Sequence, residues 1–215
     1  DGSRIAFCSN RHGDFDLFCM STTGREAPVA LTQGDGDEMH PSWSPNGSKI
    51  AYCAYDARLG DWELRVLDLA TGAKTYLGLN GLYPEWSPDG KRLAFQRARE
   101  RGEHWYSIWM VQVTQAAGSW QVQVSNPSEL VADPDWGAVT PAWSSDSRFL
   151  TFVTVNRGRR GEAWKGEGIW MVAHDGTALI QLTPSGAPVS SPSWGSDDRV
   201  YFVSARNGFK RIWSL

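Results

Sequence analysis

Four histidines are the residues best suited to acid–base or metal chemistry in this chain of 215 residues. His12, His40, His104 and His174 form no His-x-x-x-His pair, the spacing that directs two imidazoles to one metal ion. The sequence also lacks the Gly-x-Ser-x-Gly motif of serine hydrolases and the Gly-x-x-x-x-Gly-Lys loop that binds phosphates. We therefore expect no catalytic residue, no metal and no cofactor.

Three cysteines leave two interpretations open. Cys8 and Cys19 flank a turn near Gly13, so a disulfide between facing strands is one expectation. Buried free thiols are the other, because cysteine packs as a small apolar residue. With Cys53 the number is odd, which gives little information on the cellular compartment.

The remaining residues favour binding of a partner over catalysis. Tryptophan and arginine, which are enriched at binding hot spots, gather in irregular segments at 55–62, 97–106, 133–137 and 156–167. The alternative is that these tryptophans pack under their own loops. The candidate partner-binding residues are Trp62, Arg99, Arg101, Trp105, Trp136, Arg157, Arg159, Arg160 and Trp164.

Composition restricts the classes of protein further. The chain has 41% hydrophobic residues, 21% charged residues and a net charge of -3, which argues against disorder and against binding nucleic acid along its whole length. No apolar run reaches the roughly 18 to 20 residues that span a bilayer. The chain begins at Asp1 without a methionine, which predicts a processed or truncated N-terminus.

A repeat organises the elements that carry these residues. The segment Pro41-Ser42-Trp43-Ser44-Pro45-Asn46-Gly47 recurs from Pro84, from Pro141 and from Pro192. Its tryptophans are Trp43, Trp86, Trp143 and Trp194, spaced by 43, 57 and 51 residues. Asp1-Gly2 matches the end of a fifth, truncated copy.

Each repeat predicts four short antiparallel strands, here called a to d from the axis outward. An Asn-Gly or Asp-Gly turn is followed by an apolar strand, a polar loop and a second apolar strand, which is typical of a β-propeller blade. We predict an all-β propeller of about five blades, at 1–38, 39–81, 82–138, 139–189 and 190–215. Strand a of the first blade and strand d of the last are missing, so the chain is expected to form part of a six-bladed ring.

The repeat Pro-x-Trp-Ser-Pro-Asp-Gly resembles the WD40-like repeat of TolB-type propellers, and related repeats occur in propellers of prolyl oligopeptidase relatives. The resemblance covers almost the whole chain. It implies a bacterial envelope protein in the periplasm or another extracytoplasmic location. TolB itself binds the peptidoglycan-associated lipoprotein and has an additional N-terminal domain, which this sequence does not show.

The twelve tryptophans divide by position. Trp43, Trp86, Trp143 and Trp194 occupy one register, and Trp109, Trp170 and Trp213 occupy a second, so these seven are expected to fill the space between blades. In a propeller the b–c loops share one face with the d-to-a connections. The candidate binding residues therefore belong to one face, which we call the b–c face.

We predict a non-catalytic interaction scaffold that binds another protein through the b–c face, as a TolB-like envelope protein or a subunit of a larger complex. Neither nucleic acid nor a membrane is an expected direct partner. Two alternatives are a propeller that gates a peptidase or hydrolase and a carbohydrate binder that uses Trp164 and the neighbouring arginines.

Overall fold

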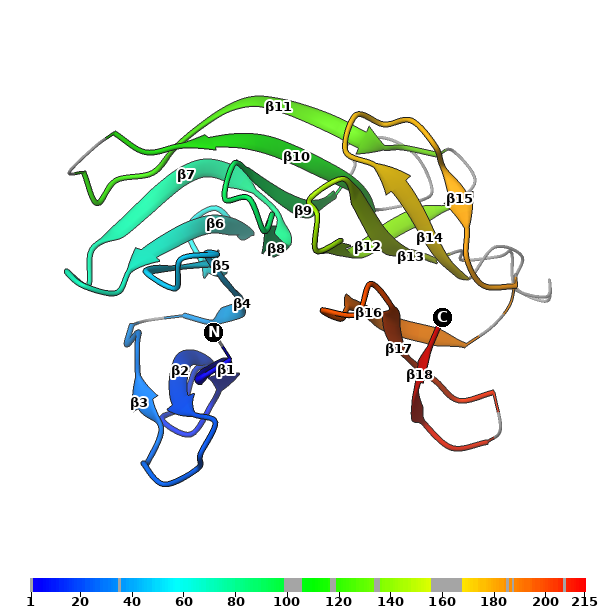
Figure 1. Cartoon of the computed structure of the whole chain (residues 1–215). Helices are drawn as coiled ribbons and strands as arrows, with labels where there is room; N and C mark the ends of the chain where they lie inside the picture. Colours follow the sequence, from blue (N-terminus) through cyan, green and yellow to red (C-terminus); the bar gives the residue numbers. More distant parts are fainter. Residues whose placement is uncertain are drawn as a thin grey trace.

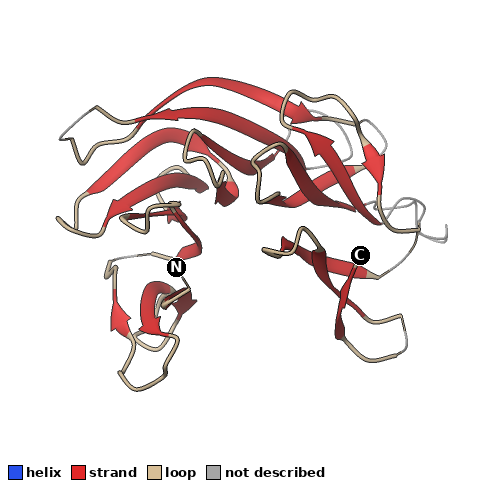
Figure 2. Ribbon diagram, in the orientation of Figure 1, coloured by secondary structure: helices blue, strands red, loops and turns tan. Residues whose placement is uncertain are grey.

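The computed structural model describes residues 2–34, 36–98, 106–116, 119–133, 136–155, 168–184, 186, 188–206 and 208–215. Within this described part the regular elements are all strands, arranged as five antiparallel sheets in chain order around a common centre (Figures 1 and 2). The predicted all-β propeller with incomplete first and last blades is confirmed.

Three blades have four strands and the two terminal blades have three. Blade 1 contains β1 (Arg4–Ser9), β2 (Asp16–Ser21) and β3 (Val29–Ala30). Blade 2 contains β4 (Glu38–Trp43), β5 (Lys49–Asp56), β6 (Asp61–Asp68) and β7 (Lys74–Asn80). Blade 3 contains β8 (Leu82–Trp86), β9 (Arg92–Ala98), β10 (Tyr106–Thr114) and β11 (Gln123–Val131). Blade 4 contains β12 (Gly137–Trp143), β13 (Phe149–Val155), β14 (Gly168–Ala173) and β15 (Ile180–Gln181), and blade 5 contains β16 (Val189–Trp194), β17 (Val200–Ser204) and β18 (Arg211–Ser214).

A β-bulge interrupts every inner strand at the same place. The residue before the repeat proline has a positive φ in all four copies: 56° at His40, 50° at Tyr83, 51° at Thr140 and 52° at Ser191. The pairing register shifts at each of these sites. Proline has no N–H to donate to the ladder, and a bulge is where a strand tolerates it. The bulges bring the rings of His40 and Tyr83 together, with centroids 3.6 Å apart.

Neighbouring blades are held together by apolar layers, and the repeat tryptophans lie in them. Trp86 packs with blade 2 residues such as Leu64, and Trp143 packs with blade 3 residues such as Ile108. The indole Nε1 of Trp143 also donates to the backbone oxygen of Glu85 in blade 3, at 3.0 Å. The expectation that the tryptophans of this register join adjacent blades is confirmed.

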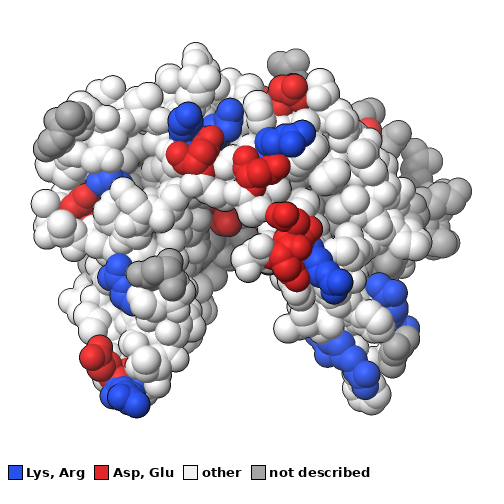
Figure 3. Space-filling model, in the orientation of Figure 1, with Lys and Arg blue, Asp and Glu red and all other residues white. Residues whose placement is uncertain are grey.

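The ring of blades is open between its two ends. Blade 1 and blade 5 face each other across the opening, and the surface is notched there (Figures 1 and 3). Ile212 in β18 is 75% exposed, whereas Leu17, Leu64, Ile108 and Ile169, which hold the same register in the other blades, are each 0% exposed. The side of blade 5 that faces away from blade 4 therefore presents apolar residues that other blades bury.

The cysteines are free thiols. Cys8 lies opposite Leu17 and Cys19 lies opposite Ala6, so the two cysteines do not face each other across β1 and β2. The expectation of a cross-strand disulfide between Cys8 and Cys19 is wrong, and buried thiols are the correct interpretation for Cys19 and Cys53.

Candidate interaction surface

A pocket opens between blades 2 and 3 at the b–c face. Its volume is about 250 Å³. One wall comes from the start of β6 and the end of β7, and the other comes from the end of β9 and the start of β10. The lining residues are Asp61, Trp62, Asn80, Gly81, Leu82, Gln96, Arg97, Ala98 and Tyr106. We call this pocket the interblade groove.

Trp62 is the predicted binding residue that lines the groove. It lies at the second position of β6, half-buried, and its ring is tilted by 59° against Tyr55 at a centroid distance of 5.5 Å. The carboxylate of Asp61 accepts a hydrogen bond from the Trp62 backbone N–H at 2.7 Å, and the Trp62 backbone oxygen accepts one from the Gly81 N–H at 3.0 Å. These contacts hold the backbone of Trp62 while leaving part of its ring accessible.

The opposite wall carries a positive charge. Arg97, at the end of β9, lies over the ring of Trp109 with its guanidinium carbon 5.0 Å from the ring centroid. Gln96 beside it is buried, and its side-chain oxygen accepts a hydrogen bond from the backbone N–H of Thr140 in blade 4 at 3.0 Å. This wall is therefore fixed from behind, because Gln96 connects it to the next blade.

Trp136 occupies a different environment. Its ring stacks on Phe152 at 6.1 Å and on Trp170 at 5.8 Å between centroids, and it packs against the core shared by blades 3 and 4. Packing accounts for much of this side chain, and its part in binding stays a prediction. The other predicted binding residues lie outside the described residues: Arg99, Arg101, Trp105, Arg157, Arg159, Arg160 and Trp164.

Two acidic side chains near the first loop are buried. Asp16 and Glu38 are 5% and 4% exposed, and Lys74 forms an ion pair with Glu38 at 3.0 Å. Burial, with the nearby Glu38 charge, raises the pKa of Asp16. No group of three or more potential metal ligands occurs among the described residues.

Sequence reasoning missed several residues that line the groove. Asn80 lies at the end of a strand and was not considered. Arg97 and Tyr106 lie at the two ends of the irregular segment 97–106 but were not selected, and the structure places both in strands. The available signal was the arginine run that begins at Arg97, of which only Arg99 and Arg101 were selected.

Charges on the face shown in Figure 3 are mixed in sign, with acidic and basic side chains next to one another.

The fold and the repeat define a β-propeller of WD40-like blades. Among curated proteins, the Tol-Pal system protein TolB of a Polaromonas species is 35% identical over 75 residues, which cover 35% of this chain and 17% of that protein. The chain is thus similar to TolB, and the resemblance drawn from the repeat is confirmed. No protein-family model matches the chain.

Solved structures share the fold. The crystal structure of TolB from Acinetobacter baumannii matches 99% of this chain and 50% of its own length, with 20% identity and a TM-score of 0.73. A puromycin-hydrolysing peptidase of Mycobacterium tuberculosis matches 99% of this chain and 36% of its own length, with 16% identity and a TM-score of 0.64. The chain therefore spans half or less of the length of these relatives.

Proposed function

We propose that this propeller is a non-catalytic scaffold that binds another protein through its b–c face, in the periplasm or another extracytoplasmic location. The observation that carries the proposal is the interblade groove, where Trp62 and Arg97 line a pocket on the face predicted to bind. Aromatic and arginine side chains on a rigid support are the residues that most often dominate binding energies. The similarity to a Tol-Pal system protein supports a role in the cell envelope.

The described part of the chain contains no helix long and apolar enough to cross a membrane. We propose that contact with the membrane occurs through the protein partner. The first partner to test is the peptidoglycan-associated lipoprotein, because TolB, to which the chain is similar, binds it.

The test is isothermal titration calorimetry of the chain against the soluble domain of that lipoprotein. A variant with Trp62→Ala, Trp105→Ala and Trp164→Ala should bind at least tenfold more weakly, because it loses several aromatic contacts. Trp120→Ala is the matched control: the residue is 38% exposed, lies between β10 and β11 of blade 3, and does not line the groove. Equal affinity of the triple variant would contradict a role for these residues, and no measurable binding of the lipoprotein domain by the wild-type chain would contradict the proposed scaffold function.

The alternative is a propeller that gates a peptidase. The fold similarity to the puromycin-hydrolysing peptidase supports it. Sequencing the gene on both sides of this segment separates the two functions, because the alternative requires a hydrolase domain in the same polypeptide.

A further inference from the structure

The groove presents a guanidinium that has no ion-pair partner among the described residues. Arg97 is half-buried and its guanidinium lies over the ring of Trp109, whose indole Nε1 donates to the hydroxyl of Ser107 at 2.9 Å. A guanidinium that rests on an aromatic ring keeps the N–H groups at its edge available. Those N–H groups match the two oxygens of a carboxylate.

The acidic residue on the facing wall does not neutralise this charge. The carboxylate of Asp61 accepts the Trp62 backbone N–H and the side-chain Nδ2 of Asn80, both at 2.7 Å. Both Asp61 oxygens therefore have local donors, and no ion pair joins Asp61 to Arg97. Asn80 is exposed, and its side-chain oxygen remains available to accept a hydrogen bond.

Gly81 and Leu82 contribute apolar lining between the polar residues of the groove. A Cβ at Gly81 would lie 2.6 Å from a ring carbon of Phe95 and 2.9 Å from the backbone oxygen of Gln96, so only glycine fits. Leu82 follows it and is half-buried. A volume of about 250 Å³ is below the usual range of 300 to 1,000 Å³ for small-molecule sites, and it suits one or two side chains of a larger partner.

We propose that the interblade groove binds an extended peptide segment in which an acidic residue lies beside an apolar residue. The carboxylate pairs with Arg97, the apolar side chain packs on Trp62 and Leu82, and a peptide N–H donates to Asn80. This inference rests on the proposed scaffold function and names the chemistry that the scaffold recognises.

The test uses capped, fluorescently labelled peptides and measures their binding by fluorescence anisotropy. The probe is Gly-Ser-Leu-Asp-Phe-Ser-Gly, and the comparison peptides replace its Asp by Asn or by Lys. Wild-type chain should bind the Asp peptide about tenfold more tightly than the Asn peptide, because charge-assisted hydrogen bonds are roughly twice as strong as neutral ones. In Arg97→Gln the preference for Asp over Asn should disappear.

Arg58→Gln is the matched control. Its side chain is 90% exposed on the b–c loop of blade 2, where it pairs with Asp56 at 3.3 Å, and it does not line the groove. This variant should keep the preference for Asp. If Arg97→Gln does not fold, the relative affinities of the Asp, Asn and Lys peptides for the wild-type chain test the inference.

Equal binding of the Asp and Asn peptides, tighter binding of the Lys peptide, or an Asp preference that persists in Arg97→Gln would overturn the inference. Lack of binding by every peptide would overturn it too. The proposed scaffold function fails separately, because it is measured with the intact lipoprotein domain rather than with these peptides.

Discussion

Glu85 is a carboxylic acid placed where its ionisation opposes folding. It lies half-buried in inner strand β8, and its backbone oxygen accepts the indole N–H of Trp143 in the next blade. Burial raises the pKa of Glu85 to about 7 from an ordinary value of 4.5, although a contact with the Ser42 hydroxyl acts in the opposite direction. The charged form is therefore disfavoured in the folded state.

The pKa of Glu85 predicts how stability depends on pH. Because the folded value lies above the unfolded one, the favourable contribution is complete below pH 4.5 and is lost as pH rises through about 7. Between pH 5 and 8 the wild-type chain should lose about 2 kcal/mol relative to Glu85→Gln, which stays neutral. Urea unfolding across this range measures the difference. Glu26→Gln, at an exposed loop position, should run parallel to wild type, and a Glu85→Gln curve that does the same would contradict the prediction.

Residue types alone do not establish which side chains meet. The repeat register correctly assigned Trp86 and Trp143 to the layers between blades, because four copies of one motif fix one position. The cysteine pairing failed because it was inferred from the turn near Gly13, whereas the register common to the blades pairs Cys8 with Leu17, as it pairs Cys53 with Leu64. Cys19 pairs with Ala6 rather than with Cys8, and a shift of two residues is invisible in the loop sequence.

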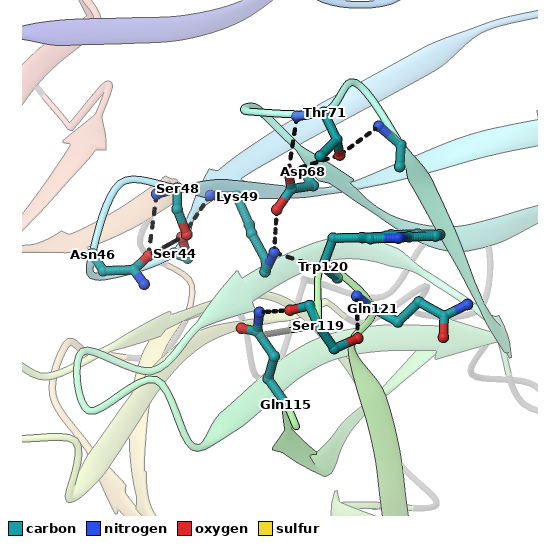
Figure 4. Close-up of polar contacts among 11 residues, drawn as sticks. Ser44, Asn46, Ser48, Lys49, Asp68, Thr71, Gln115, Ser119, Trp120 and Gln121 are labelled. Atoms are coloured by element: carbon teal, nitrogen blue, oxygen red, sulfur yellow. Dashed lines mark hydrogen bonds and ion pairs between the residues drawn. The ribbon is translucent and has the colours of Figure 1, made fainter. Parts of the chain in front are cut away.

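At the scale of elements, a buried ion pair within blade 2 is linked by a hydrogen bond to blade 3. Lys49 in β5 bonds the carboxylate of Asp68 at the end of β6, and its ammonium also donates to the backbone oxygen of Trp120 in blade 3 at 3.0 Å (Figure 4). Thr71 donates two further hydrogen bonds to Asp68. The hydrogen bond from Lys49 is the largest cause that lowers the pKa of Asp68, to about 2.

Removing the lysine charge leaves Asp68 buried without its cation. Lys49→Met should therefore destabilise the chain by about 3 kcal/mol, measured by urea unfolding. Arg148→Met is the control: its pair with Asp146 spans 3.8 Å, is largely exposed, and should change stability by less than about 0.5 kcal/mol. The double variant Lys49→Met with Asp68→Leu should recover part of the loss. Equal effects of Lys49→Met and Arg148→Met would show that the buried pair contributes little.

Strands were predictable where the apolar pattern repeats, and their irregularities were not. The segments that begin at Arg4, Lys49 and Arg92 are strands as expected, because alternation and turn residues agree there. The positive φ before each repeat proline was not anticipated, although a proline within a strand is itself a signal of a bulge. In the groove, Arg97 lay in the predicted loop segment 97–106 and was not selected there, whereas the structure places it in β9.

At the scale of the whole molecule, each blade depends on the blade that follows it. Leu17 packs on blade 2, Leu64 on blade 3, and Ile169 on blade 5, through one repeated layer. The repeat made this ring predictable, since a blade cannot bury both of its faces alone. Residues that lack a neighbouring blade are exposed. Ile5 in blade 1 is 48% exposed, whereas Ile50 in the corresponding position of blade 2 is fully buried.

Truncation to alanine at equivalent positions of different blades should therefore have unequal effects on stability. Leu64→Ala removes a fully buried side chain from the layer between blades 2 and 3 and should cost about 2 to 5 kcal/mol. Ile212→Ala removes a side chain that is 75% exposed and should change stability by no more than about 0.5 kcal/mol in this chain. Urea unfolding of both variants measures the two costs under identical conditions. A large loss in Ile212→Ala would mean that blade 5 is covered in solution, and a small loss in Leu64→Ala would contradict the interblade layer itself.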